Sequence, residues 1–257
     1  MVAFENKEKL GIVLIVAIAL AAIVALLLQN PIGQDPSYHG FSDTRKIFSI
    51  LNFWNVFSNV PFLVVGLFGL YKILVSGNLT IKDDLKAAYI LLFFGIMLVA
   101  FGSGYYHLWP NNQTLVWDRL PMTIAFMALF SIVISEFVSN AAGKALLFPL
   151  IIIGVASVFY WHVGELKGAG DLRLYAFVQF FPMLAIPVIL ICFGSSFTEV
   201  KGYSLLLIAY IAAKLFEQFD AEVYAALGFM SGHAIKHALA ALGLYILLVS
   251  YERRCLA

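Results

Sequence analysis

Eight apolar windows, each close to the length of a membrane-spanning helix, constrain this 257-residue chain more than any other feature. A bilayer core about 30 Å thick is crossed by roughly 20 apolar residues in a helix, which satisfies its own backbone polar groups. Hydrophobic residues make up 62% of the chain and charged residues 12%, which is too apolar for a soluble domain. The sequence therefore predicts an all-α polytopic membrane protein, with windows near residues 10–28, 50–75, 87–107, 119–138, 144–161, 172–194, 201–217 and 231–250.

The first window follows Lys7 and Lys9, an arrangement that a signal peptide also shows. Its apolar stretch is longer than that of a signal peptide, and no cleavage site of small residues follows it. We therefore expect a membrane helix that is retained. The net charge of +1 and the absence of a basic run exclude the electrostatic signature of a nucleic-acid-binding protein.

The distribution of Lys and Arg between the two predicted faces indicates the orientation. Nine of these residues lie on the face of the N-terminus and five on the other, with Lys214 and Lys236 inside windows and left uncounted. Because cytoplasmic loops carry the excess of positive charge, we expect both termini in the cytoplasm. Counting crossings from there places His107, Asp118 and His233 together at the non-cytoplasmic side.

Three histidines are spaced as a metal site requires. His233 and His237 are four residues apart, and Ser103 and His107 are also four apart, so each pair lies on one helix face. Zinc binds neutral imidazole, and a catalytic zinc site typically has three protein ligands. The alternative is that each histidine hydrogen-bonds a neighbouring helix. Because placing a polar group in lipid costs free energy, each of the three histidines would then need its own explanation. One shared metal ion accounts for all three, so we favour a metal site.

Asp118 and Ser103 are the predicted catalytic residues at this membrane level. Asp118 is expected to begin the fourth window, where a helix N-cap is the simplest alternative. Ser103 has glycine on both sides, so a helix-packing role is equally compatible with its position. We favour a site role for Asp118 because it shares the level of the histidines.

Further polar and aromatic residues are candidates for substrate contacts. Tyr175 and Gln179 lie one helical turn apart and could bind a lipid headgroup, although an intramembrane Gln more often bonds another helix. Trp109 is a candidate beside the site, with interfacial anchoring as the alternative. An acidic group in the predicted last loop is interpreted as solvated, or else as orienting a ligand histidine; it comprises Glu217, Asp220 and Glu222.

Residues 52–62 read Asn-Phe-Trp-Asn-Val-Phe-Ser-Asn-Val-Pro-Phe and resemble the opening helix of the alkaline ceramidases, which are integral membrane zinc amidases. The other signature pieces of that family follow in order. They are Ser-x-x-x-His at Ser103 and His107, Asp-x-Leu-Pro-Met at residues 118–122, and His-x-x-x-His at His233 and His237. These pieces cover four of the eight windows.

The resemblance implies a fold, a cofactor and a reaction. It implies a seven-helix domain in residues 31–257, with residues 1–30 as an additional N-terminal transmembrane helix. It implies zinc held by His107, His233 and His237 and a pocket for a ceramide-like membrane lipid. A zinc-activated water would then cleave the amide to a fatty acid and a sphingoid base, with Asp118 as proton shuttle and Ser103 binding the oxyanion or the water.

Other functions are also compatible with these residues, and the sequence departs from the ceramidase pattern at one place. The wider group includes the adiponectin receptors, so a zinc-containing receptor or scaffold with little turnover is the alternative function, followed by a haem or metal-ion membrane protein. Eukaryotic ceramidases bind calcium through an acidic stretch before the first core helix. Residues 38–45 hold a single carboxylate, which argues against a similar calcium site. The identity of the lipid amide and the oligomeric state stay open.

Overall fold

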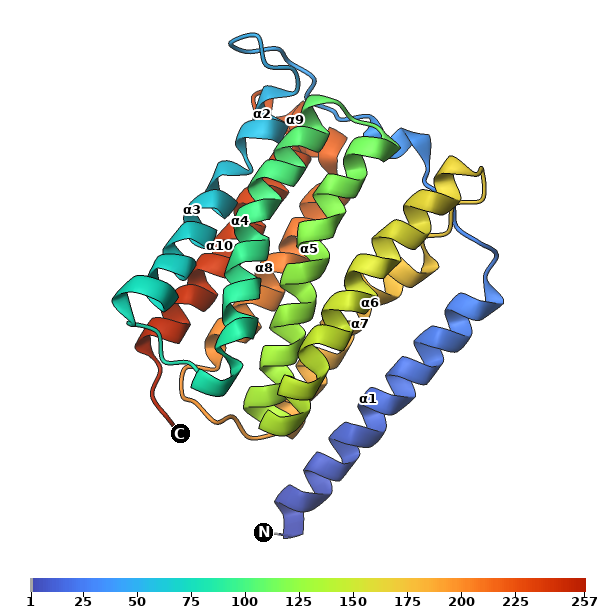
Figure 1. Ribbon diagram of the computed structural model, residues 1–257. Helices are drawn as coiled ribbons and strands as arrows, with labels where there is room; N and C mark the ends of the chain where they lie inside the picture. The colour runs from blue at the N-terminus through green and yellow to red at the C-terminus, as the bar shows by residue number, and fades with distance from the viewer. Residues whose placement is uncertain (1) are drawn as a thin grey trace.

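Long helices run side by side through the computed structural model, which describes residues 2–257 (Figure 1). Residues 2–257 contain no named strand and form ten α-helices, so the predicted all-α fold is confirmed. The α-helices are α1 (Val2–Leu28), α2 (Phe53–Phe57), α3 (Val60–Tyr71), α4 (Lys86–Leu108), α5 (Asn112–Val133), α6 (Asn140–Leu166), α7 (Arg173–Cys192), α8 (Lys201–Gln218), α9 (Asp220–Leu227) and α10 (Gly232–Arg253). Short 3₁₀ helices η1 (Pro36–His39) and η3 (Asp83–Leu85) and π-helical turns η2 (Lys72–Ser76) and η4 (Ile134–Val138) complete the elements.

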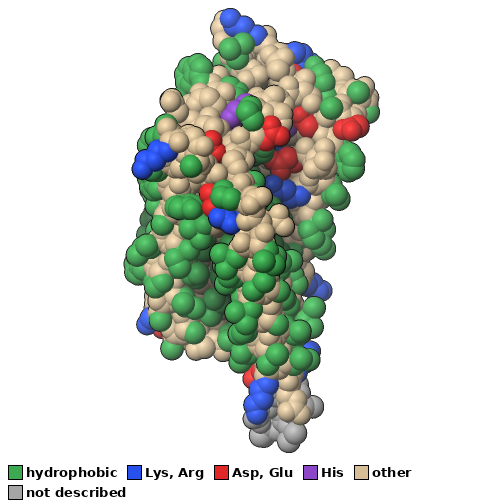
Figure 2. All heavy atoms as spheres, turned by 90° about the vertical axis from the view of Figure 1, so that its right-hand side faces the viewer, with side chains coloured by type: hydrophobic (Ala, Val, Ile, Leu, Met, Phe, Trp, Pro, Cys, Tyr) green, Lys and Arg blue, Asp and Glu red, His purple; other side chains and the backbone are tan. Residues whose placement is uncertain are grey.

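Seven helical stretches are long and apolar enough to cross a membrane, which makes the chain an integral multi-pass membrane protein. Figure 2 shows hydrophobic side chains covering the long flank of the molecule, while charged side chains gather toward its upper part and at its lower end. α8 is 18 residues long but carries Lys201, Lys214 and Glu217, and it is not among the seven. It nevertheless packs along α10 inside the bundle.

Local sequence signals set helix boundaries that the apolar windows miss. α5 begins at Asn112, because the Asn111 side chain caps the backbone N–H groups of residues 113 and 114 and Thr114 completes a capping box. The expectation that the fourth helix opens at Asp118 is therefore wrong. The second window is also divided, since α2 ends at Phe57 and α3 starts with Pro61 in its first turn.

Two glycines allow the helices around the histidines to approach closely. A Cβ atom on Gly102 of α4 would lie 1.9 Å from the carbonyl oxygen of Trp117 in α5. A Cβ on Gly232 of α10 would lie 2.1 Å from the carbonyl oxygen of Phe216 in α8. Any larger residue would push these helices apart. The close contacts hold Ser103 and His107 beside Asp118, and His233 beside the end of α8.

A buried ion pair joins the C-terminal segment to η4 at the end of the bundle away from the histidines. Arg254 donates to Glu136 at 2.8 and 2.9 Å, and both side chains are almost completely shielded from solvent. Tyr203 donates to the same carboxylate at 2.7 Å, and Tyr89 donates to its other oxygen. The pair thus joins η4 to α4, α8 and the residue that follows α10.

α1 lies at one edge of the bundle and packs along α7 (Figure 1). Arg173, the first residue of α7, donates to the backbone carbonyls of Leu26 at 3.2 Å and Gln29 at 2.7 Å. Both chain ends lie at the same end of the bundle in Figure 1, opposite α2 and α9.

Candidate active site

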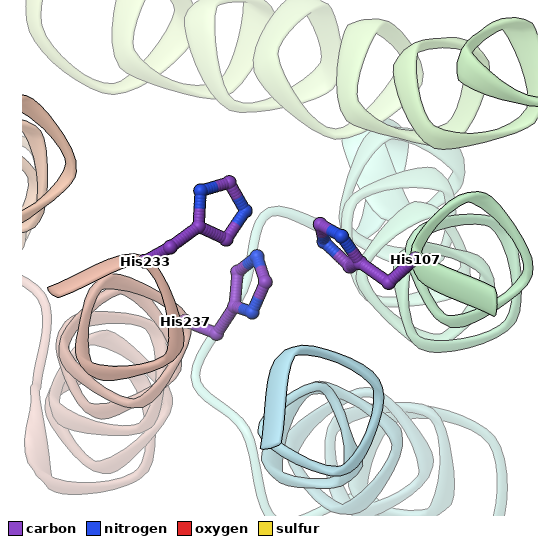
Figure 3. A group of neighbouring side chains, drawn as sticks. All are labelled: His107, His233 and His237. Carbon is purple, nitrogen blue, oxygen red and sulfur yellow. The ribbon is translucent and has the colours of Figure 1, made fainter. Parts of the chain in front are cut away.

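Three histidines from two helices point toward one another at the end of the bundle that carries α2 and α9 (Figure 3). His107 comes from the last turn of α4, whereas His233 and His237 come from the first turns of α10. Their ring centroids are 4.9 to 5.1 Å apart, and one nitrogen from each ring lies within 4.8 Å of the others. The three side chains that the sequence predicts as a cluster are therefore brought together.

The hydrogen bonding of these rings fits a metal site. His107 is 1% exposed and the other two are 6% exposed. Both ring nitrogens of His107 and Nε2 of His233 are buried without a hydrogen-bond partner. Buried polar atoms are nearly always paired, because an unmade hydrogen bond costs about 1–3 kcal/mol. Unpartnered imidazole nitrogens that face a common point can instead hold a metal ion.

Ser58, at the end of α2, orients the third ring. The Ser58 hydroxyl donates to the carbonyl of Asn55 at 3.2 Å, and its oxygen lies 2.8 Å from Nδ1 of His237. In the tautomer that carries its proton on Nδ1, His237 donates to the Ser58 oxygen while the hydroxyl proton is directed to Asn55. The lone pair of His237 Nε2 then remains available, which is the arrangement that metal-binding histidines commonly show. Ser58 lies within the motif of residues 52–62, but nothing in the sequence signals this role.

The loop before α2 covers the histidines. The ring of Phe41 is 7% exposed and lies 4.8 Å from the ring of His107 and 4.7 Å from that of His233. Asp43 is 1% exposed and binds Arg45 at 2.6 Å. Burial alone would raise the pKa of the Asp43 carboxyl, but the hydrogen bonds from Arg45 and their charge interaction bring that pKa below its usual range.

The acidic group expected in a solvated last loop lies elsewhere, and that expectation is wrong. Glu217 belongs to α8, whereas Asp220 and Glu222 lie in the first turn of α9. Asp220 accepts the backbone N–H of His233 at 2.6 Å and that of Ser42 at 3.0 Å. Asp220 thereby joins the covering loop to the first turn of α10, in line with the alternative that an acidic residue helps to place a histidine.

Asp118 lies beside the histidines and not at a helix end. It is the seventh residue of α5, so the alternative that it caps this helix is excluded. Asp118, Ser103 and His237 line one cavity. A carboxylate, a hydroxyl and an imidazole therefore meet at the same wall.

The cavity has a volume of about 360 Å³ and lies inside the bundle, with α7 and α8 forming much of its wall. Beyond the site its lining is mainly apolar, including Leu129, Met183 and Leu244. Tyr175 and Gln179 both line the cavity as predicted positions for substrate contact, and Gln179 donates to Tyr210 at 3.2 Å. An elongated apolar ligand with a polar group at the site end suits this lining.

The structure does not bring Trp109 to the cavity. Its side chain is 56% exposed, and its ring packs edge-on against Tyr105 on the outside of the bundle. Trp109 follows the last residue of α4, so it lies at the height of the site but faces away from it. Interfacial anchoring, which the sequence offered as the alternative, agrees with this position.

Four charged residues lie at the site, and from the sequence only Glu217 had a possible site role, whereas Lys214, Lys236 and Arg119 had none. Glu217 accepts from Lys214 at 2.7 Å and forms a second ion pair with Lys236. Arg119 is 6% exposed and lies over the rings of Trp161 and Tyr175; all four charged residues line the cavity. The available signal was the presence of charges inside or beside apolar windows, where they are rare and usually functional.

Comparison with known proteins assigns the family. Residues 46–198, more than half of the chain, match the family described as Ceramidase. The chain belongs to the ceramidase family. No curated protein matches the chain. The matched range includes Ser103, His107 and Asp118 and ends before His233 and His237, which the fold adds to the same site. Membership indicates a membrane-embedded hydrolase of the ceramidase type that acts on a lipid amide.

Proposed function

We propose that this ceramidase-family protein is an intramembrane zinc-dependent hydrolase that cleaves the amide of a ceramide-like lipid to a fatty acid and a sphingoid base. One observation carries the proposal: three buried histidines converge, and one of them, His237, lines an apolar cavity together with Asp118. A metal site alone would suit a receptor equally well. The adjacent carboxylate and the cavity supply a proton acceptor and a place for a lipid chain.

His107, His233 and His237 would hold the metal. Bound there, zinc would supply a Lewis acid for the amide carbonyl and make an attacking water more acidic. Ser58 and Asp220 keep His237 and the first turn of α10 in place through the hydrogen bonds described above. Phe41 keeps bulk water away from the rings of His107 and His233.

Asp118 moves the proton in this proposal. Its carboxylate accepts a proton as water adds to the amide carbon, and it returns that proton to the nitrogen as the carbon–nitrogen bond breaks. Ser103 lines the cavity together with Asp118 and would donate to the developing oxyanion. The cavity orients the substrate chain so that the amide meets these groups.

The position of the cavity suggests how lipid enters and leaves. α7 and α8 are consecutive helices that both line the cavity, yet they form no extensive packing with one another. A lipid amide would enter between them from the bilayer, with Tyr175 and Gln179 contacting its polar part. In this proposal residues 31–257 form the hydrolase domain and residues 1–30 an accessory membrane helix, with both termini in the cytoplasm and the site on the opposite side.

The test is a mass-spectrometric screen of lipid amides incubated with purified protein, with and without a zinc chelator. We expect fatty acid and free amine in equal amounts, lost on chelation and in His107→Ala. Asp118→Asn should retain zinc and lose hydrolysis. Asp35→Asn is its matched control, because Asp35 lies outside the cavity and caps η1. Stoichiometric zinc without release from any amide would overturn the hydrolase and favour a receptor or scaffold.

A further inference from the structure

The charges in the cavity gather at the histidine end. Lys236 directly precedes His237 on α10, Arg119 directly follows Asp118 on α5, and Glu217 bonds Lys236 from α8. The charged residues that line the cavity are Asp118, Arg119, Lys214, Glu217 and Lys236. Three cations and two carboxylates therefore line this cavity, and they are not evenly paired with one another.

Arg119 is the one cation of this set without an ion pair among the described side chains. Glu217 is shared by Lys214 and Lys236, so these three residues form one network. Among the described side chains, none of the ion pairs includes Arg119. Its Nη2 donates to the amide oxygen of Gln34 at 2.6 Å, and its Nη1 is buried without any hydrogen-bond partner. A buried cation without an anion is unfavourable unless a ligand supplies the anion.

Aromatic rings fix the position of this guanidinium. The Arg119 Cζ atom lies 4.2 Å from the ring centroid of Trp161, 4.7 Å from that of Tyr175 and 5.9 Å from that of Tyr38. These contacts hold the group in place but give its buried Nη1 no hydrogen-bond acceptor. Arg119 also occupies the variable position of Asp-x-Leu-Pro-Met, so the family pattern does not account for it. A guanidinium held in this way is suited to carboxylate, sulfonate or phosphate.

From this we infer that the site selects lipid amides that carry an anionic group close to the amide, with Arg119 as the residue that determines this specificity. The inference rests on the proposed hydrolase function and narrows its substrate class. Neutral histidines do not offset the charge of a bound metal, so a metal would add to the positive potential. A neutral headgroup would leave the Arg119 guanidinium without an ion-pair partner, whereas an anionic headgroup would supply that partner.

The test compares amides that share one acyl chain and one amine chain. They differ only in the group on the carbon beside the amine-bearing carbon, which is a hydroxyl, a carboxylate, a sulfonate or a phosphate. Hydrolysis is measured with purified full-length protein in a neutral detergent. We expect at least one anionic amide to exceed the hydroxyl compound in kcat/KM by about 10- to 100-fold, as one charged hydrogen bond allows. The three anionic arms identify which anion is preferred.

Variants assign the preference to Arg119. Arg119→Gln should lower kcat/KM for the anionic amide by a much larger factor than for the hydroxyl compound, so that the preference is lost. Arg119→Lys keeps the charge without the planar fork and should retain part of the preference. Lys167→Gln is the matched control, because it removes an exposed positive charge that follows α6 outside the cavity. Equal or better hydrolysis of the hydroxyl compound by the native protein would overturn the inference, as would a uniform loss in Arg119→Gln.

A binding measurement separates this inference from the hydrolase proposal. If no amide is cleaved, the hydrolase proposal fails. Binding of long-chain carboxylates, sulfonates, phosphates and alcohols is then compared by isothermal titration calorimetry. Tighter binding of one anionic amphiphile, lost in Arg119→Gln, would support the anion site by itself. Equal binding of the anions and the alcohol would refute it.

Discussion

Replacing Ser58 by alanine tests whether one hydrogen bond sets the metal affinity of the site. The variant removes the oxygen 2.8 Å from Nδ1 of His237 and leaves the rest of α2 unchanged. His237 is 6% exposed, so water does not readily replace the lost partner. The imidazole would then be free to rotate or to change tautomer, and its Nδ1 proton would be buried without an acceptor.

Two estimates of the size of this effect agree. A buried donor left unpaired costs about 1–3 kcal/mol. Loss of a residue that orients a metal ligand weakens metal binding by about 10- to 100-fold, which corresponds to about 1.4 to 2.7 kcal/mol. We therefore expect Ser58→Ala to weaken zinc binding by one to two orders of magnitude, short of the nearly complete loss expected for His237→Ala.

The assay is competition for zinc between the purified protein and a chromophoric chelator. Ser204→Ala is the matched control, since Ser204 is exposed on α8 near the opposite end of the bundle. An unchanged zinc affinity in Ser58→Ala, together with loss in His237→Ala, would refute the reasoning that this hydroxyl holds the ring.

Three further predictions follow from other contacts. Asp118→Asn should retain zinc but lower kcat by about 10²- to 10⁴-fold, as measured by fatty-acid release, and full activity would exclude the proton shuttle. Gly102→Ala should reduce activity on the order of 10²-fold by displacing α4 from α5, whereas Gly104→Ala, whose Cβ meets open space, should not. Glu136→Gln should lower the free energy of unfolding by about 3–5 kcal/mol because Arg254 loses its partner, and the double change Glu136→Leu with Arg254→Met should cost less. Reversible unfolding in mixed micelles measures both, and equal costs would contradict this explanation.

The apolar windows predict most of the long helices because lipid demands one continuous helical segment per crossing. α4 differs from its window by one residue at each end, at Lys86 and Leu108. α5 was placed seven residues too late, since its first turns are polar and depend on the cap at Asn111. α9 was missed because its eight residues carry no membrane signal, and they lie where a loop was expected.

Some residues of the candidate site were predicted from the sequence, and others were not. The histidines were found because helical spacing and crossing parity are both visible in a sequence, and the structure brings them together. Ser58, Lys236 and Arg119 were missed as site residues, since their partners lie on other helices and only the fold reveals them. Trp109 shows the converse, because the height of a residue in the membrane does not determine the direction of its side chain.

Zinc K-edge X-ray absorption on the purified protein tests the proposed zinc site directly. The proposed site predicts one zinc per chain with three imidazole nitrogens at about 2.0 to 2.1 Å and a further light-atom ligand. It also predicts that this signal is lost in His107→Ala and retained in Asp118→Asn. A preparation without stoichiometric metal, or a metal environment that His107→Ala leaves unchanged, would contradict the proposed site.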